Sequence, residues 1–124
     1  MIQHDFEQMR TQFLTEFEAA RPAMSALGDA VRQQIAATLI ETGGRGGIRV
    51  GEIRKRTNIS RSAVSHHLKV LMDAGIINVR RDGTRNYYYL DPESSSLRQL
   101  AKFWEQVEPM MKACGQKSQE ELRR

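Results

Sequence analysis

The chain has few of the residues that hold small proteins together covalently or anchor them in membranes. Its 124 residues include a single cysteine, Cys114, which excludes an internal disulfide and a thiolate cage for a metal ion. No run approaches the roughly 18 apolar residues that a membrane-spanning helix requires, and the N-terminal MIQHDFEQMR lacks the basic and apolar regions of a secretory signal. With three prolines and 27% charged residues, the composition is typical of an ordered, soluble protein. We therefore expect a cytoplasmic protein whose residues 1–124 form one domain around a single core.

Positive charge is concentrated in the middle of the chain. Residues 45–86 contain ten lysines and arginines against Glu52, Asp73 and Asp82, a net charge of +7, whereas the rest of the chain carries −3. A basic segment between mildly acidic ends is typical of a surface that meets a polyanion such as nucleic acid. On charge alone, an ordinary solvated surface remains an equal alternative.

Apolar residues recur at helical spacing near both ends of the chain. One stripe predicts an amphipathic helix over residues 1–21, which Pro22 should end, and a second predicts a helix over 93–117, followed by a charged tail over 118–124. The stripes consist of Phe6, Met9, Phe13 and Phe17 in the first helix, and of Leu97, Leu100, Trp104 and Met111 in the second.

A further helix is predicted from about Ala30 to Glu41, with Asp29 as its N-cap. The glycine-rich run GGRGG follows at residues 43–47. It lacks the Lys-Ser/Thr pair that ends a phosphate-binding loop, so we interpret it as a flexible connector and not as a nucleotide site.

Residues 48–91 have the layout of a winged helix. A short helix at about 51–57, the turn at 58–59 and a helix that opens at Ser60 and stops at Gly75 make a helix-turn-helix over 48–75. Two extended runs around Asp82-Gly83 predict a β-hairpin over 76–91. The predicted fold class is mainly α with a small β-hairpin (α+β), a winged helix-turn-helix with an additional helix at each end.

The second helix of this motif has one apolar face and one polar face. With 3.6 residues per turn, Val64, Leu68 and Leu71 share the core side, His66 lies opposite them, and His67 is turned toward the rim of the core. The two adjacent histidines therefore cannot chelate one metal ion from a regular helix. The polar face predicts a helix that enters the major groove of DNA, although the outer face of an ordinary core helix would also be polar.

We predict eight DNA contacts on this basis. The side chains expected to read bases are Arg61, Ser62, Ser65 and His66, and those expected to contact phosphates or the minor groove are Lys69, Arg80, Arg81 and Arg85.

The segments "SAVSHHLKVL", "DAG" and "RRDGTRNYYYL", together with "ALGDAVRQQIAATL" upstream, resemble the ArsR/SmtB family of bacterial winged-helix repressors. The resemblance covers roughly residues 24–92. It implies a homodimeric repressor that binds a palindromic DNA operator until an inducer binds. It also implies that the two terminal stripes form the dimer surface, while packing within one protomer remains an equal and compatible interpretation.

The chain departs from the family where metal sensors bind their metal. The two cysteine positions of the family's Cys-x-Cys-Asp-Leu stretch fall on Arg49 and Gly51, and no histidine follows His67 to build the family's other site on the last helix. We therefore expect no metal site, no cofactor, and a non-metal or unknown inducer. A carboxylate site at Glu105 and Glu108, and redox sensing by Cys114 across a dimer axis, remain open as minor alternatives.

The sequence also bears on two other function classes. A winged helix can bind an acidic protein partner through the same arginines, and this remains the alternative function. An enzyme is not expected, because the sequence has no nucleophile elbow, no cofactor loop and no spaced carboxylate pair in an apolar setting.

Overall fold

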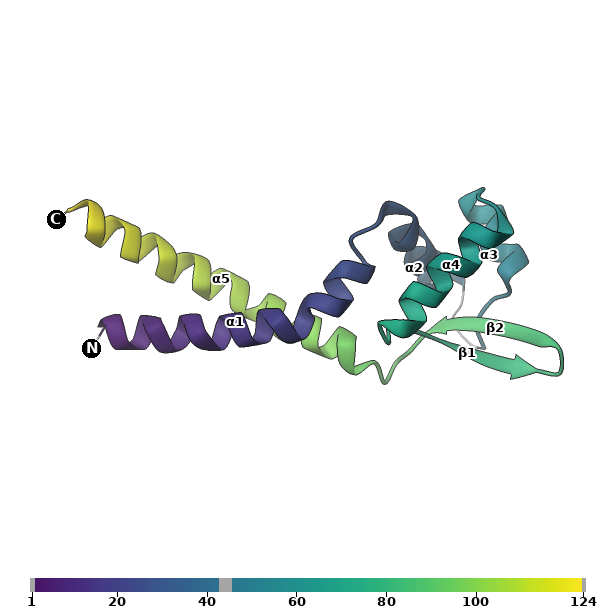
Figure 1. Ribbon diagram of the computed structural model, residues 1–124, viewed down its shortest axis with the longest axis horizontal. Helices are drawn as coiled ribbons and strands as arrows, with labels where there is room; N and C mark the ends of the chain where they lie inside the picture. The colour runs from purple at the N-terminus through teal and green to yellow at the C-terminus, as the bar shows by residue number, and fades with distance from the viewer. Residues whose placement is uncertain (1, 43–45, 124) are drawn as a thin grey trace.

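The computed structural model describes residues 2–42 and 46–123 of the chain. Their elements are, in order, α1 (Ile2–Ala26), α2 (Ala30–Thr42), α3 (Val50–Thr57), α4 (Arg61–Asp73), β1 (Ile77–Asp82), β2 (Arg85–Leu90) and α5 (Ser95–Leu122). Figure 1 shows α2, α3, α4 and the hairpin grouped into a body, from which α1 and α5 extend toward the two termini. The predicted winged-helix layout, mainly helical with one small hairpin, is confirmed.

The core of the body is formed where α2, α3, α4 and β1 meet. Ile35, Ile53 and Leu71 each have no exposed surface, and other aliphatic side chains of the same elements pack around them. Val64 and Leu68 are buried beside Leu71, which confirms the predicted core face of α4. Burying such aliphatic side chains contributes about 1.5–3 kcal/mol each, so this core fixes the orientation of α4.

The first helix is longer than the sequence predicts. α1 continues through Pro22 to Ala26, so the predicted end before Pro22 is wrong. The reason is tertiary packing: Ala20, Ala23 and Ala26 are all buried, and this burial offsets the hydrogen bond that proline cannot donate. The last turn of α1 thereby reaches the body.

The two terminal helices pack against each other through an aromatic cluster. Phe103 of α5 is buried, with its ring centroid 5.1 Å from that of Phe13 and 5.3 Å from that of Phe17 on α1. Lys102 Nζ lies 3.3 Å from a carboxylate oxygen of Glu16, which adds an ion pair to the contact. The pair α1–α5 is therefore a packed unit within one protomer.

The last helix also differs from its predicted bounds. Ser94 accepts a hydrogen bond from the backbone N–H of Leu97 at 3.1 Å, so α5 starts two residues later than predicted, at Ser95. It then continues to Leu122, so the predicted end of the helix at 117 is wrong, and the charged tail predicted over 118–124 is helical over 118–122.

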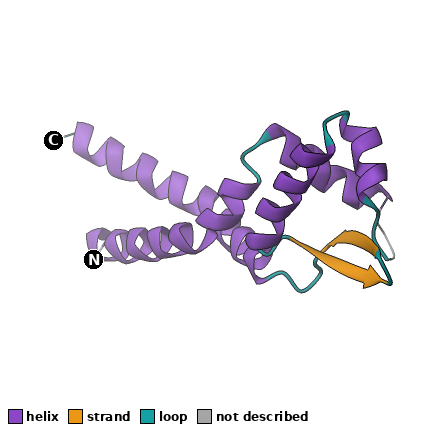
Figure 2. Cartoon of the chain, turned by 45° about the vertical axis from the view of Figure 1, so that its right-hand side comes forward, coloured by secondary structure: helices purple, strands orange, loops and turns teal. Residues whose placement is uncertain are grey.

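The hairpin lies at the end of the molecule remote from both termini (Figure 2). β1 and β2 are antiparallel, and Ile48 adds a bridge on the other side of β2, exchanging hydrogen bonds of 2.9 and 2.8 Å with Tyr88. Gly47 permits this approach, because its φ is +82° and a Cβ would lie 2.4 Å from the Tyr88 carbonyl oxygen. Within the predicted connector, residues 43–45 lie outside the described residues, whereas Gly47 has a defined place against the wing.

Candidate nucleic-acid interface

The ends of helix α4 are fixed by local interactions. At its start, Ser60 Oγ accepts a hydrogen bond from the backbone N–H of Ala63 at 3.1 Å. At its end, Gly75 adopts a φ of +75° and turns the chain into β1. With Val64 and Leu68 buried on one side, the opposite side of α4 must face solvent.

Of the predicted base-reading residues, Ser62, Ser65 and His66 lie on this outer side, whereas Arg61 is the first residue of the helix and is nearer the core side. Arg61, Ser62, Ser65 and His66 are exposed, and they share one helix without a large apolar side chain between them. Lys69, one turn further on, is also exposed, and its Nζ lies 3.0 Å from Asp73 Oδ2 in an ion pair on the surface. An exposed pair of this kind contributes little, so the ammonium group can exchange Asp73 for a phosphate.

His66 and His67 have different surroundings, as the helical wheel predicts. His66 is exposed, whereas His67 is half-buried and its Nδ1 lies 3.2 Å from Arg32 Nη1. Arginine can only donate, so Nδ1 of His67 accepts this bond and a neutral ring carries its proton on Nε2. His67 is therefore held by α2.

Arg32 also connects α4 to the end of α1. Its Nε donates a hydrogen bond of 2.6 Å to the carbonyl oxygen of Ala26. Asp29 caps α2 next to it, accepting from the backbone N–H groups of Val31 at 2.9 Å and Arg32 at 3.1 Å. The bond from the Arg32 backbone N–H, together with the positive Arg32 side chain, holds the pKa of Asp29 below its usual range.

The three wing arginines do not share one face. In the hairpin register Arg80 is opposite Tyr87 and Arg81 is opposite Asn86, and neighbouring residues of a strand point to opposite faces. Arg80 is occupied within the protein, because its guanidinium lies 4.5 Å from the centre of the Tyr87 ring and donates to Gly46 O at 3.3 Å. Arg81 is on the same face as Asn86, and Arg85 is on the face of Arg80.

A polar groove that the sequence analysis did not predict lies between α3, the start of α4 and the wing. It has a volume of about 560 Å³, and its lining includes Arg49, Gly51, Lys55, Arg61, Thr84 and Asn86. Arg49 and Lys55 belong to the basic segment of the sequence, but no sequence pattern indicates a role for them. Helical periodicity predicts the outer face of α4, but it does not indicate which side chains of α3 lie next to the wing.

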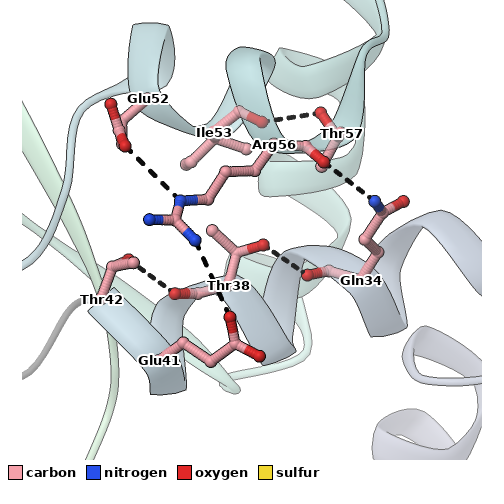
Figure 3. Close-up of polar contacts among 8 residues, drawn as sticks. All are labelled: Gln34, Thr38, Glu41, Thr42, Glu52, Ile53, Arg56 and Thr57. Atoms are coloured by element: carbon pink, nitrogen blue, oxygen red, sulfur yellow. Dashed lines mark hydrogen bonds and ion pairs between the residues drawn. The ribbon is translucent and has the colours of Figure 1, made fainter.

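The neighbouring Arg56 is directed toward α2 and is not part of the groove lining (Figure 3). Its Nε lies 3.5 Å from Glu52 Oε1 and its Nη1 lies 3.8 Å from Glu41 Oε2. Its carbonyl oxygen accepts a hydrogen bond of 3.0 Å from the Gln34 side chain. Arg56 therefore joins α3 to α2, and Glu52 already has a cationic partner.

The two predicted terminal stripes divide into inward and outward residues. Phe6 and Phe13 are half-buried, Phe17 packs on Phe103, and Leu97 and Leu100 are half-buried against the core. By contrast, Met9, Trp104 and Met111 are exposed, with 67% of the Trp104 and Met111 surfaces accessible. Phe103, which the predicted stripe omitted, is the α5 residue that α1 covers.

Other candidate sites gain no support from the described residues. Among the side chains that the structure describes, over 5–42 and 46–123, no group of three or more His, Cys, Asp or Glu residues is close enough together to hold a metal ion. Cys114 is exposed. In the same part of the chain, no helix combines the length and the apolar character needed to cross a membrane.

Comparison with known proteins relates this geometry to one family. The profile described as "Bacterial regulatory protein, arsR family" matches residues 46–79. The HTH-type transcriptional regulator Rv2034 of Mycobacterium tuberculosis is 38% identical over 93 residues, covering 73% of this chain and 83% of that protein. The arsenical resistance operon repressor of Bacillus subtilis is 30% identical over 87 residues, covering 70% and 77%. Among solved structures, the transcriptional repressor BigR from Xylella fastidiosa matches with a TM-score of 0.59 and 25% identity, covering 74% of this chain and 90% of that one.

Proposed function

Because this chain belongs to the ArsR family of bacterial regulatory proteins and is a DNA-binding transcriptional regulator, we propose that it is a homodimeric repressor that reads a palindromic operator. The observation that carries the proposal is the outer face of α4, where Ser62, Ser65 and His66 are exposed while the opposite face is locked into the core. Two of the similar proteins are named as repressors, which favours repression.

In this proposal the contacts are divided by their chemistry. Ser62, Ser65 and His66, with Arg61 at the start of α4, read base edges in the major groove. Phosphate contacts come from Lys69 and from the wing arginines Arg80, Arg81 and Arg85. Arg81 is the strongest candidate in the wing, because Arg80 already packs on Tyr87 and Gly46.

The dimer is proposed to form through α1 and α5. Leu14, Trp104 and Met111 expose 52, 67 and 67% of their surfaces, a large apolar exposure for an isolated protomer. An apolar groove of about 430 Å³ continues this surface, lined by Met24, Leu27, Leu97, Leu100, Ala101 and Trp104. A two-fold dimer would present its two α4 helices to half-sites about one helical turn of DNA apart.

We propose a signal other than a metal ion, since the described residues contain no cluster of metal ligands and the family's cysteine positions hold Arg49 and Gly51. A cytoplasmic location and a non-enzymatic role are part of the same proposal. The DNA-binding test that follows does not depend on either of them.

The test is a selection of bound sites from random duplex DNA, followed by fluorescence titration of the selected site. Ser65→Ala and His66→Ala should lose preference for that site, by about 1–3 kcal/mol for each base contact removed. Arg81→Ala should weaken selected and unrelated DNA alike and reduce the slope of log K against log salt by about 1. Arg98→Ala, which removes an exposed arginine paired with Glu93 at the start of α5, is the control for net charge.

The proposal fails if the wild-type protein enriches no sequence, or if Ser65→Ala and His66→Ala both retain full preference. Failure of the wild-type protein to bind DNA would favour the alternative, an acidic protein partner for the basic surface.

A further inference from the structure

The ring of His67 lies where α4 meets the start of α2, and it contacts a charged side chain there. Its Nδ1 lies 3.2 Å from Arg32 Nη1, and Arg32 Nε donates to the carbonyl oxygen of Ala26 at 2.6 Å. Arg32 and His67 are both half-buried. The guanidinium is therefore held between the end of α1 and the histidine ring on α4.

The hydrogen bond between these two side chains requires a neutral imidazole. A guanidinium donates hydrogen bonds and accepts none, so Nδ1 of His67 has to be the acceptor. Protonation places a hydrogen on both ring nitrogens and gives the ring a positive charge. Two donors and two cations would then face each other, and the ring has to turn away from Arg32. Histidine ordinarily changes its charge between about pH 5 and 8.

The acidic group on the α2 side of the ring is Asp29. The hydrogen bond from the Arg32 backbone N–H is the main cause that holds the pKa of Asp29 below its usual range, and the charges of Arg32 and His67 lower it further. Asp29 therefore stays ionised throughout the range in which histidine titrates. Because its Oδ1 already accepts from two backbone N–H groups, it remains at the start of α2 in both charge states of His67.

The other elements packed against α4 are α3 and β1. Among the described residues, none of their charged side chains forms a hydrogen bond or an ion pair with His67. Those side chains are Glu52, Arg54, Lys55 and Arg56 in α3, and Arg80, Arg81 and Asp82 in β1. On α4 itself, the exposed His66 ring lies 5.4 Å from the His67 ring, and Lys69 is paired with Asp73. The charge state of His67 therefore acts mainly on its contact with Arg32.

We propose that His67 is a pH-sensitive switch for operator reading, in which the neutral ring is bound to Arg32 and protonation releases it. The inference rests on the proposed function, because the regulated surface is the face of α4 that reads the operator. His67 directly follows His66 and is two residues from Ser65, so the released ring moves at the edge of that face. Acid should then reduce discrimination between operator and unrelated DNA, while the added positive charge favours contact with any phosphate.

The test measures this discrimination, the affinity for the selected operator divided by the affinity for unrelated duplex DNA. Between about pH 7.5 and about pH 5.5, within the histidine range, the ratio should fall about fivefold in the wild-type protein, the effect of one lost hydrogen bond. His67→Asn should lack this fall, because its Oδ1 can accept from Arg32 at the place of Nδ1 but cannot titrate. His66 titrates in both proteins, so the difference between them reports His67.

Two variants on α2 complete the comparison. Arg32→Ala removes the donor, so its discrimination should already be low at neutral pH and should lack the fivefold fall that depends on the bond. Gln33→Ala is the matched control, since Gln33 is the exposed neighbour that bonds the carbonyl oxygen of Leu27 and not His67. Gln33→Ala should keep the wild-type pH dependence. All four proteins are compared below their unfolding transitions at each pH.

Nitrogen-15 NMR of the free protein detects the ring without DNA. At about pH 8 the ring is neutral, and His67 should carry its proton on Nε2, because Nδ1 accepts from Arg32. In Arg32→Ala the ring should instead populate both neutral tautomers. Signals of His66→Asn and His67→Asn assign the two α4 histidines.

The outcomes separate this inference from the proposed function. If the wild-type protein selects an operator but its discrimination changes with pH as much in His67→Asn as in wild type, the switch is refuted and the α4 site stands. A neutral His67 ring protonated on Nδ1 would refute it as well. If the wild-type protein selects no DNA, the proposed function fails, and the switch fails with it.

Discussion

Replacing Arg32 with alanine should destabilise the protein and weaken DNA binding, although Arg32 lies outside every proposed contact surface. The guanidinium bonds the carbonyl oxygen of Ala26 at 2.6 Å and Nδ1 of His67 at 3.2 Å from a half-buried position. Buried hydrogen bonds of a charged group are worth about 1.5–3 kcal/mol each. Because this site is partly solvated, we expect a loss of about 2 kcal/mol for the two bonds together.

This loss converts to a measurable shift in thermal unfolding. An unfolding entropy of about 2.1 cal/mol/K per residue gives about 0.26 kcal/mol/K for 124 residues, so the midpoint should fall by about 8 °C at fixed protein concentration. The matched control is Gln33→Ala. Gln33 Nε2 donates to the carbonyl oxygen of Leu27 at 2.7 Å, but the bond is neutral and exposed, so its loss should lower the midpoint by only about 2 °C.

Arg32→Ala should also weaken DNA binding, because the His67 ring on α4 loses the hydrogen bond that holds it. Below the unfolding transition, Arg32→Ala should bind the operator more weakly than Gln33→Ala, since α4 keeps its core packing but loses the polar link from His67 through Arg32 to the end of α1. In a double-mutant cycle, Arg32→Ala and His67→Ala should show a coupling energy of about 1 kcal/mol in stability. Equal midpoints for Arg32→Ala and Gln33→Ala, or strictly additive effects with His67→Ala, would refute the reasoning.

Three further predictions concern the local devices that hold the site. Ser60→Ala removes the side-chain cap of α4 and should cost about 1 kcal/mol in a urea unfolding experiment; no change in midpoint would mean that the cap is dispensable. Gly47→Ala should destabilise the wing, because φ is +82° and the new Cβ would lie 2.4 Å from Tyr88 O. The amide hydrogen of Tyr88 should then exchange faster in the variant than in the wild-type protein, and an unchanged exchange rate would contradict the prediction. Asp29→Asn keeps a capping oxygen but cannot titrate. Since the pKa of Asp29 is lowered in the folded protein, its carboxylate stabilises the fold at neutral pH and this stability is lost as pH falls below about 4; urea midpoints of wild type and variant should therefore converge in acid, and parallel curves would contradict the assignment.

The helix-turn-helix and its outward face could be predicted because they depend on local signals. Val64, Leu68 and Leu71 follow helical periodicity without interruption, and Ser60 and Gly75 mark the two ends of the helix. Once the core face was known, the opposite face followed from geometry alone.

The contacts that could not be predicted join residues that are distant in the sequence. Arg32 and His67 are 35 positions apart, and neither residue type indicates the other. α5 has apolar residues on more than one face, so its sequence did not distinguish Phe103, which α1 covers, from the exposed Trp104. At Pro22, burial of the neighbouring alanines overrode the local preference for a helix end.

The position of β1 at the edge of the sheet gives Arg80 and Arg81 a second role besides DNA contact. β2 is paired on both sides, with β1 and with Ile48, whereas in the described part of the chain β1 pairs with β2 alone. Its free edge presents backbone groups that no other strand pairs and that could template a strand from another molecule, apart from the Val79 N–H, which donates to Asn78 Oδ1 at 2.8 Å. Four of its six residues are polar or charged, namely Asn78, Arg80, Arg81 and Asp82, and charged side chains on an edge oppose such pairing. Arg80 and Arg81 therefore also oppose pairing at the edge of β1, and variants that replace them with large apolar residues should aggregate more readily than the wild-type protein.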